Sequence, residues 1–409
     1  MSLTRFLPVP SDRMGILWSL LNIEDSIVVE YGPAGTTHFS MSLFGEIGIE
    51  QENRLFTTHM REDDVVMGDV SRLENALVEV DRNFHPAAIF VSASSSSAVI
   101  GTDLRGVCTM LRPKLKARLV SFEQGGFRGD YSAGIRETYR LLAGQMVDSD
   151  TPKRSEAYNI IGASVGSYRC KADVLELERL MREAFGMQAH ARLCLETDLE
   201  RIRTMGGAAI NLVLRSEALD AARILEKSCG TPYHYGAPYG YDGTISWLES
   251  VGKLLGREPA PALMAALKKS AAEARQYQMY GRMLRRDKPQ AVLYGDYEAV
   301  RGLGAFLSGV GIQPVHRISM HNISALDDAG GVEYFPAERE RIALLRGLQR
   351  TLLLADDTSR RLVNDGNTFM RISTPVIDGA QLATHMPVMG PRGADMLMEY
   401  VDGYFNTLR

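Results

Sequence analysis

The segment from Ser26 to Phe39 constrains the fold of this chain more than any other stretch. An apolar, largely β-branched run, SIVVEY, breaks into Gly32-Pro33-Ala34-Gly35 and continues into the polar residues Thr36-Thr37-His38. Such a run is typical of a buried strand in a parallel sheet, and glycines at its end allow positive φ and close approach of a partner. Because ligands of open α/β sheets lie at the carboxyl ends of strands, this turn is expected to border a binding site.

The same alternation of strand and helix occurs three times along the 409 residues. After the first strand, further strands are predicted at 87–91 and 117–122, then at 157–161, 191–195, 208–214 and 233–235, and finally at 290–294, 312–318, 351–355 and 369–372. One helix is expected over 99–111, a polar linker over 148–154, and a long charged helix over 260–285 that spaces two domains. This spacing indicates βαβ units with parallel sheets. The predicted fold is α/β, with three Rossmann-like domains at 1–152, 153–284 and 285–409, the last ending in a helix.

Charge, hydropathy and cysteine spacing exclude several classes of function. A formal net charge of -4 gives no sign of a nucleic-acid or anionic-membrane partner. No apolar run approaches the roughly 20 residues that span a bilayer, and no signal segment opens the chain. The four cysteines lie far apart with no CxxC spacing, which disfavours a disulfide framework or a zinc site. The expected location is the cytoplasm.

Seven short motifs follow one another along nearly the whole chain, at Glu30–Gly35, Glu62–Gly68, Ser92–Asp103, Gly126–Gly129, Asn159–Gly162, Gly230–Tyr233 and Met389–Ala394. In this order they resemble nitrogenase component 1 and its relatives. That family includes the nitrogenase subunits, the scaffold for assembly of their cofactor, and the dark-operative protochlorophyllide reductases. Glu30–Gly35 stands where the family has a His-Gly-Pro-x-Gly-Cys loop. The resemblance implies three Rossmann-like domains and an iron–sulfur cluster held between two subunits.

The chain departs from this family at the cysteines. Thr36 stands at the cysteine position of the Gly-Pro loop, Ser95 at that of the Ile-Ile-Gly-Asp-Asp segment, and the earliest cysteine would fall around Pro10 or Ser11. Arg215 aligns with the cysteine that ligates the catalytic cofactor in the nitrogenase α subunit. Hydroxyls are poor iron ligands beside thiolates. This chain's own cysteines are therefore expected to hold no cluster, and no metal ligands are assigned.

The resemblance marks one set of residues as facing a cofactor: Gly32, Pro33, Gly35, Thr36, Thr37, His38, Ser95, Arg128 and Arg215. Each has a plainer alternative. The glycines could form only a tight turn, and the serines around Ser95 could be a loop tip. His38 could be a hydrogen-bonded surface histidine rather than a proton donor.

The two arginines of this set also allow two interpretations. Arg128 and Arg215 could make one cationic pocket for carboxylates of a tetrapyrrole-like or homocitrate-like ligand. Alternatively, each could pair with a nearby acid such as Asp130 or Glu217. No catalytic residue can be named from the sequence.

Three functions follow from the resemblance. The preferred one is a nitrogenase-like component 1 subunit of an ATP-dependent reductase, which receives electrons from an iron-protein-like ATPase. A cysteine-bearing sister subunit, in a heterodimer or heterotetramer, would supply most cluster ligands; a homodimer is the other possibility. The second is a non-catalytic scaffold or binding protein for a metallocluster or tetrapyrrole intermediate. The third is a structural partner that only completes a heterodimer.

Overall fold

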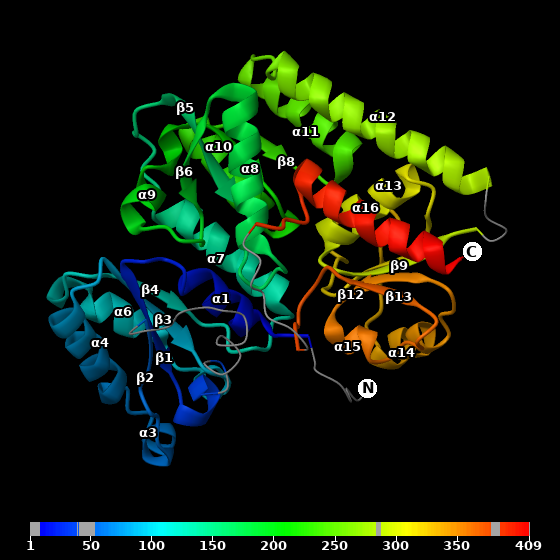
Figure 1. Ribbon diagram of the computed structural model, residues 1–409. Coiled ribbons are helices and arrows are strands. Elements are labelled where there is room, and N and C mark those ends of the chain that lie inside the picture. The colour runs from blue at the N-terminus through cyan, green and yellow to red at the C-terminus, as the bar shows by residue number, and fades with distance from the viewer. Residues whose placement is uncertain (1–8, 39, 41–53, 284–287, 378–384, 409) are drawn as a thin grey trace.

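The computed structural model describes residues 9–38, 40, 54–283, 288–377 and 385–408, with the side chains of 278–283 excepted. Three parallel sheets form three lobes, as Figure 1 shows. The predicted α/β fold with three Rossmann-like domains is confirmed. The domain limits at 152/153 and 284/285 stay predictions.

The first sheet has the order β2-β1-β3-β4, and β1 pairs in parallel with β2 and β3. Its strands are β1 (Ser26–Tyr31), β2 (Leu55–Thr57), β3 (Ala88–Ala93) and β4 (Arg118–Phe122). Its helices are α1 (Asp12–Leu20), α3 (Glu62–Met67), α4 (Ser71–Phe84), α5 (Ser95–Val99), α6 (Leu104–Leu111) and α7 (Tyr131–Gln145), with a 3₁₀ turn at Arg112–Lys114. Residues 34–38 and 40 are also helical.

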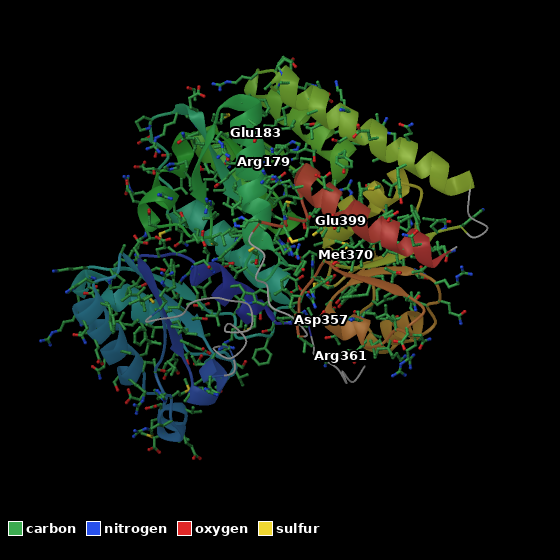
Figure 2. The ribbon with its side chains drawn as sticks, in the orientation of Figure 1. Arg179, Glu183, Asp357, Arg361, Met370 and Glu399 are labelled. Atoms are coloured by element: carbon green, nitrogen blue, oxygen red, sulfur yellow. The ribbon has the colours of Figure 1, made fainter. Side chains whose placement is uncertain are left out.

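The second sheet has the order β6-β5-β7-β8. Its strands are β5 (Arg154–Ile161), β6 (Gln188–Arg192), β7 (Ala208–Val213) and β8 (Tyr233–Tyr235). Its helices are α8 (Cys170–Phe185), α9 (Leu199–Arg203), α10 (Leu219–Cys229), α11 (Gly240–Leu255) and α12 (Pro261–Met283), with 3₁₀ turns at Met205–Gly207 and Ser216–Ala218. Figure 2 labels Arg179 and Glu183 on α8, an i, i+4 ion pair of 2.6 Å.

The third sheet has the order β11-β10-β9-β12-β13. Its strands are β9 (Gln290–Gly295), β10 (Gln313–Ser319), β11 (Glu333–Tyr334), β12 (Leu352–Ala355) and β13 (Thr368–Arg371). Its helices are α13 (Tyr297–Gly309), α14 (Glu338–Arg346), α15 (Asp357–Arg360) and the C-terminal α16 (Gly390–Thr407). None of the helices in the described residues combines the length and apolarity needed to cross a bilayer.

Helix α16 stays in contact with β13 of the third lobe and also packs against α8 and α11 of the second (Figure 1). Tyr241 of α11 donates a hydrogen bond of 2.6 Å to Asp395 of α16, and the Gly390 amide donates one of 2.7 Å to the Pro238 carbonyl. The long helix α12 lies along α11 and also contacts α16. The long helix expected over 260–285 is present as α12, and its buried residues join the common core. Its role as a spacer between two domains stays a prediction.

Helix α1 crosses α7 at very short range, and two glycines make the crossing possible. A Cβ on Gly15 would lie 2.0 Å from the Tyr131 carbonyl oxygen, and one on Gly134 would lie 1.8 Å from the Asp12 carbonyl oxygen. Any side chain at either position would force the helices apart. The crossing fixes Tyr131 at the start of α7, and Tyr131 takes part in the junction of the three lobes.

Two other local predictions differ from the structure. The helix expected over 99–111 is two helices, α5 and α6, separated at Gly101, which has φ +70°. The strand expected at 191–195 is β6, which ends at Arg192, because Cys194 and Glu196 have positive φ and cannot continue a strand.

Candidate functional site

The predicted glycine loop leaves the carboxyl end of β1 as expected, and Gly32 is closely enclosed there. Its amide donates to Thr58 Oγ1 at 3.2 Å, and its carbonyl accepts from Thr57 Oγ1 at 3.1 Å. A Cβ on Gly32 would lie 2.3 Å from Ser94 Cβ. Only glycine fits between the first and third strands of this sheet edge. Gly35, in contrast, is exposed and has open space around it.

A buried ion pair between Arg13 and Glu30 holds the glycine loop in place. Glu30 at the end of β1 receives Arg13 Nε on Oε1 at 2.9 Å and Arg13 Nη2 on Oε2 at 2.6 Å, and its side chain is fully buried. Thr37 Oγ1 donates to Glu30 Oε2 at 2.9 Å, while Thr36 Oγ1 donates to the Pro33 carbonyl at 2.9 Å and more weakly to Glu30 Oε1 at 3.4 Å. These hydroxyls hold the loop to the ion pair, whereas His38 is exposed.

Ser11 and Ser95 both lie close to Gly126. A Cβ built on Gly126 would lie 3.3 Å from Ser11 Oγ and 3.6 Å from Ser95 Oγ, and Ser95 Oγ donates to the Gly125 carbonyl at 2.7 Å. The neighbouring Ser94 touches the Gly32 loop, and the same built Cβ on Gly32 lies 3.4 Å from Thr36 Oγ1. The structure therefore brings the three hydroxyl positions to one edge of the first sheet.

The donor groups at this edge do not fit a metal cluster held by this chain alone. They are neutral hydroxyls, and the four thiols lie elsewhere; all four are unpaired by disulfides. Burial raises the pKa of Cys108 to about 11 and that of Cys170 to about 12, which opposes formation of the thiolate that binds metals. Within the described ranges, no group of three or more His, Cys, Asp or Glu residues is arranged to hold a metal ion.

A second polar site lies where the three lobes meet. Arg215 follows β7, Asp296 follows β9, and Tyr131 comes from the first lobe. Arg215 Nη1 lies 2.9 Å from Asp296 Oδ2, and Tyr131 OH donates to Asp296 Oδ1 at 2.6 Å. Arg215 Nη2 donates to Glu217 Oε1 at 2.8 Å, and Tyr131 OH lies 3.0 Å from His321 Nδ1. One arginine thus joins residues of all three lobes.

Burial and mutual charge set the protonation of this junction. Burial alone would raise the pKa of Asp296, but the charges of Arg215 and His321 lower it to about 2. Burial, followed by the charge of Glu217, raises the pKa of Glu298. Glu298 Oε1 accepts from the Ser216 amide at 2.7 Å and has a buried Oε2 without a hydrogen-bond partner among the described residues. Burial alone would also raise the pKa of Glu217, but the charge of Arg215 lowers it. The junction thus holds two carboxyls with a lowered pKa, Asp296 and Glu217, and one with a raised pKa, Glu298.

The cavity at this junction is small. Its volume is about 50 Å³, with Gly162, Ser164, Arg215, Asp296 and Glu298 in its wall. That is far below the roughly 300–1,000 Å³ of pockets for drug-sized ligands. Gly162, at φ +103°, is required there, because a Cβ would lie 2.9 Å from the Arg215 amide nitrogen. The junction in this conformation has room for water-sized molecules but for neither a tetrapyrrole nor a metallocluster.

The two predicted arginines do not share a pocket. Arg215 is buried at the junction and pairs with Glu217 and Asp296, as the plainer alternative held. Arg128 is exposed and lines a separate cavity of about 410 Å³ with Glu137 and Arg140. A single cationic cleft made by both is therefore wrong, because the two arginines line different cavities.

Sequence reasoning missed Tyr131, Ser167, Asp296, Glu298 and His321. One signal was present, since Asp296 and His321 directly follow two predicted strands at 290–294 and 312–318. Polar residues at that position of neighbouring parallel strands lie at one edge of the sheet. Ser167 and Tyr131 carried no local sequence signal, because only the packing of different lobes brings them to Asp296. Ser167 Oγ donates a hydrogen bond to Asp296 at 2.8 Å.

Comparisons with known proteins agree with this architecture. The family model of nitrogenase component 1 type oxidoreductases matches residues 11–405. The nitrogenase iron-molybdenum cofactor biosynthesis protein NifE of Clostridium pasteurianum is 25% identical over 344 residues, which cover 80% of this chain and 73% of that protein. NifE of Klebsiella pneumoniae is 29% identical over 63% of this chain and 60% of its own length. The nitrogenase molybdenum-iron protein alpha chain of Clostridium pasteurianum is 26% identical, and the match spans only 44% of it.

The fold likeness to solved structures extends over the full length. Nitrogenase Cp1 at pH 6.5 superimposes with a TM-score of 0.81 at 18% identity and covers 99% of this chain and 94% of that one. At this identity the likeness concerns the fold.

Proposed function

The chain belongs to the nitrogenase component 1 type oxidoreductase family, and from this premise we propose that it is one subunit of an ATP-dependent reductase complex. In that complex it receives electrons from an iron-protein-like ATPase and pairs with a cysteine-bearing sister subunit. The complex works in the cytoplasm, where unpaired thiols such as those of this chain persist.

One observation carries the proposal: an apolar surface on the first lobe, which we call the docking patch. It comprises Val66, Met67, Val99, Ile100 and Met110, and the exposed fractions of Val66, Met67 and Val99 are 74%, 79% and 72%. The first two end α3, and the next two lie at the end of α5. Val65 of α3 lines one cavity with Ile100 and Met110, so these segments are neighbours. Exposed apolar side chains that gather on one surface mark interaction sites on soluble proteins.

The shape and rim of the docking patch support a specific protein partner. A cavity of about 490 Å³ lies between α3 and α6, with Val65, Ile100 and Met110 in its wall. Asp64 and Asp103 add polar groups to the same wall. An apolar centre with a polar rim is the usual anatomy of a protein interface. The occupant we propose is the iron-protein-like ATPase, because four of the five patch residues, all but Met110, belong to the two motifs at 62–68 and 92–103 that relate the chain to its family.

The edge with Thr36, Ser95 and Ser11 supports the second partner. Phe127, on the loop that also carries Gly126, is 67% exposed. Aromatic residues are enriched at protein interfaces. We propose that the sister subunit covers this edge, and that its cysteines supply the thiolates of an iron–sulfur cluster at the shared surface.

Anaerobic co-expression with the genomic neighbours tests the proposal. The two subunits and the ATPase are purified separately and together, and iron content and electron transfer are measured with and without MgATP. ATP-dependent oxidation of the ATPase that requires this chain and its sister subunit supports a reductase. Stable assembly without any electron transfer would contradict it.

A scaffold for cofactor assembly is the second candidate, and the relatives favour it. Several of the similar proteins are cofactor biosynthesis proteins. In this role the same complex would bind a metallocluster or tetrapyrrole intermediate and release it without turnover. Binding of such an intermediate by the purified complex, in the absence of ATP-dependent reduction, would favour the scaffold over the reductase.

A further inference from the structure

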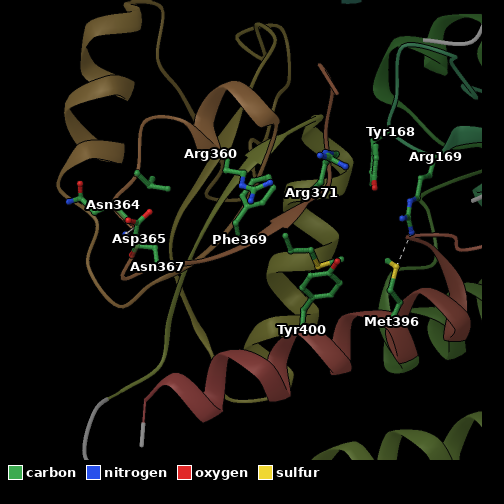
Figure 3. Close-up of a pocket in the computed structure, with 12 residues that line it drawn as sticks. Tyr168, Arg169, Arg360, Asn364, Asp365, Asn367, Phe369, Arg371, Met396 and Tyr400 are labelled. Atoms are coloured by element: carbon green, nitrogen blue, oxygen red, sulfur yellow. Dashed lines mark hydrogen bonds between the residues drawn. The ribbon is translucent and has the colours of Figure 1, made fainter. Parts of the chain in front are cut away.

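A large polar pocket lies outside the central junction, between the second and third lobes (Figure 3). Its volume is about 480 Å³, within the range of small-molecule sites. Arg169 comes from the loop before α8, Arg360 and Arg371 come from α15 and β13, and Tyr400 comes from α16. Three guanidinium groups from two lobes therefore face one cavity, which we call the arginine pocket.

Two of these arginines are held in place by aromatic rings rather than by carboxylates. The Arg169 guanidinium lies 5.0 Å from the centre of the Tyr168 ring, and that of Arg360 lies 5.3 Å from the centre of the Phe369 ring. Arg169 Nη1 also donates to the Met386 carbonyl at 2.9 Å. In the part of the chain that the structure describes, neither arginine forms a salt bridge. Stacking orients a guanidinium while leaving its N–H edge open to an anion.

The third arginine is fixed by an acid behind the pocket. Arg371 Nε and Nη2 donate to the two carboxylate oxygens of Asp357 at 2.7 and 3.0 Å. Figure 2 labels Asp357 on the third lobe. Among the described residues, Asp365 is the one acid in the pocket wall, and Asn364 adds an amide. Counting Asp357 and Asp365 against the three arginines, the site keeps a net positive charge in the absence of a ligand.

We propose that the arginine pocket binds a small organic polyanion, a molecule with at least two carboxylate or phosphate groups. Arg169 and Arg360 contact its anionic groups from opposite lobes, and the rings of Phe369 and Tyr400 contact its apolar part. Guanidinium forks match carboxylates and phosphates in geometry. A single anionic group would satisfy one arginine and leave the other unpaired, which is why the site selects multiply charged ligands.

The arginine pocket also adjoins the central junction. Tyr168 borders both cavities, and Ser167 beside it contacts Asp296 and Arg215. A ligand that bridges the two lobes would therefore stabilise their relative position at the junction.

Titration calorimetry on the full chain, with its sister subunit if the two co-purify, tests this site. Citrate and inorganic pyrophosphate are the probes, since they separate a carboxylate ligand from a phosphate ligand. At least one should bind saturably at one site per chain. Arg360→Gln and Arg169→Gln should each weaken that binding by about tenfold or more, the usual worth of a charge-assisted hydrogen bond. Arg371 is left intact, because its removal would break two hydrogen bonds to the buried Asp357 carboxylate.

Arg223→Gln is the matched control. Arg223 is an exposed arginine of α10 that pairs with Asp220, far from the pocket, and its loss should leave probe binding unchanged. Thermal melting of each variant checks that folding is intact. The proposal is overturned if neither probe binds saturably, or if the two pocket variants bind as tightly as the wild type and the control.

Discussion

Ser11 and Ser95 converge on Gly126, with their Oγ atoms 3.3 and 3.6 Å from the place where its Cβ would be. Thr36 lies at the same edge of the first sheet, beside the Gly32 loop. The family resemblance aligns Thr36 and Ser95 with cluster cysteines and places the earliest cysteine around Pro10 or Ser11. We propose that this edge keeps the backbone of a cluster site, with hydroxyls in place of the thiolates.

Restoring the thiolates tests whether this edge still has the shape of a cluster site. The variant Ser11→Cys/Thr36→Cys/Ser95→Cys, and the simpler Thr36→Cys/Ser95→Cys, should bind more iron than the wild type on anaerobic reconstitution, because thiolates are far better iron ligands than hydroxyls. Iron per chain and the visible absorption of the product measure the outcome. The control Thr109→Cys/Ser250→Cys adds two thiols at exposed positions elsewhere. Equal iron uptake by these cysteine variants and by the control would contradict the proposal that this edge has the shape of a cluster site.

The buried pair Arg13–Glu30 should dominate the stability of the first lobe. Arg13→Met leaves the Glu30 carboxylate uncompensated, and breaking a buried ion pair costs about 3–5 kcal/mol. Urea unfolding should show this loss, and hydrogen exchange should place it in β1 and the loop after it. The double variant Arg13→Met/Glu30→Leu should recover much of the loss, because it removes both charges together. A double variant as unstable as Arg13→Met would argue that the polar network, rather than the lone charge, sets the stability.

The docking patch should be specific for the ATPase. Met67→Asp places a charge in its apolar centre and should slow ATP-dependent electron transfer by at least about tenfold, the effect of losing an interface hot spot of about 2 kcal/mol. Stopped-flow oxidation of the reduced ATPase measures this rate. Leu254→Asp, at an exposed apolar residue of α11, is the control and should leave the rate unchanged. Unchanged transfer with Met67→Asp would remove the patch from the proposed function.

Asp173 should make stability fall as the pH rises. Burial raises the pKa of Asp173 to about 7, although its carboxylate accepts the amides of Val388 and Met389 at 2.6 and 2.9 Å. A raised pKa means that the folded chain binds a proton that the unfolded chain has lost. The stabilisation from this bound proton is full below about pH 3.8 and is lost as the pH rises through about 7. It amounts to roughly 1.4 kcal/mol for each unit by which the pKa is raised.

Asp173→Asn checks this sign. The amide oxygen of asparagine can still accept both backbone amides, so the variant should keep the contact between α8 and the segment before α16 and lose the pH dependence. Thermal melting from pH 5 to pH 8 measures the difference. Asp356, whose pKa is raised to about 6 by burial, gives a second and separate slope that Asp356→Asn removes. An unchanged slope between about pH 6 and pH 7 in Asp173→Asn would assign that slope to another group.

The sheets could be predicted from the sequence because their strands are apolar runs that end in turn residues. Helix α1 could not, because all nine of its residues are buried and it shows no alternation of polar and apolar faces. Strand β2 has only three residues and no run to mark it. The glycine loop was predictable from a local pattern, whereas the central junction depends on Tyr131 and His321, which are 190 residues apart and meet only through packing of the lobes.

The return of α16 to the second lobe limits how this protein can be divided. Asp395 and Gly390 form hydrogen bonds to Tyr241 and Pro238 of the middle third. A shortened chain that stops after β13 would therefore lose these bonds between its middle and final thirds. It would also expose the apolar side of α11 to solvent. Fragments meant to isolate one third for biochemistry should therefore keep this final helix with the middle third, joined by a linker or supplied as a separate peptide.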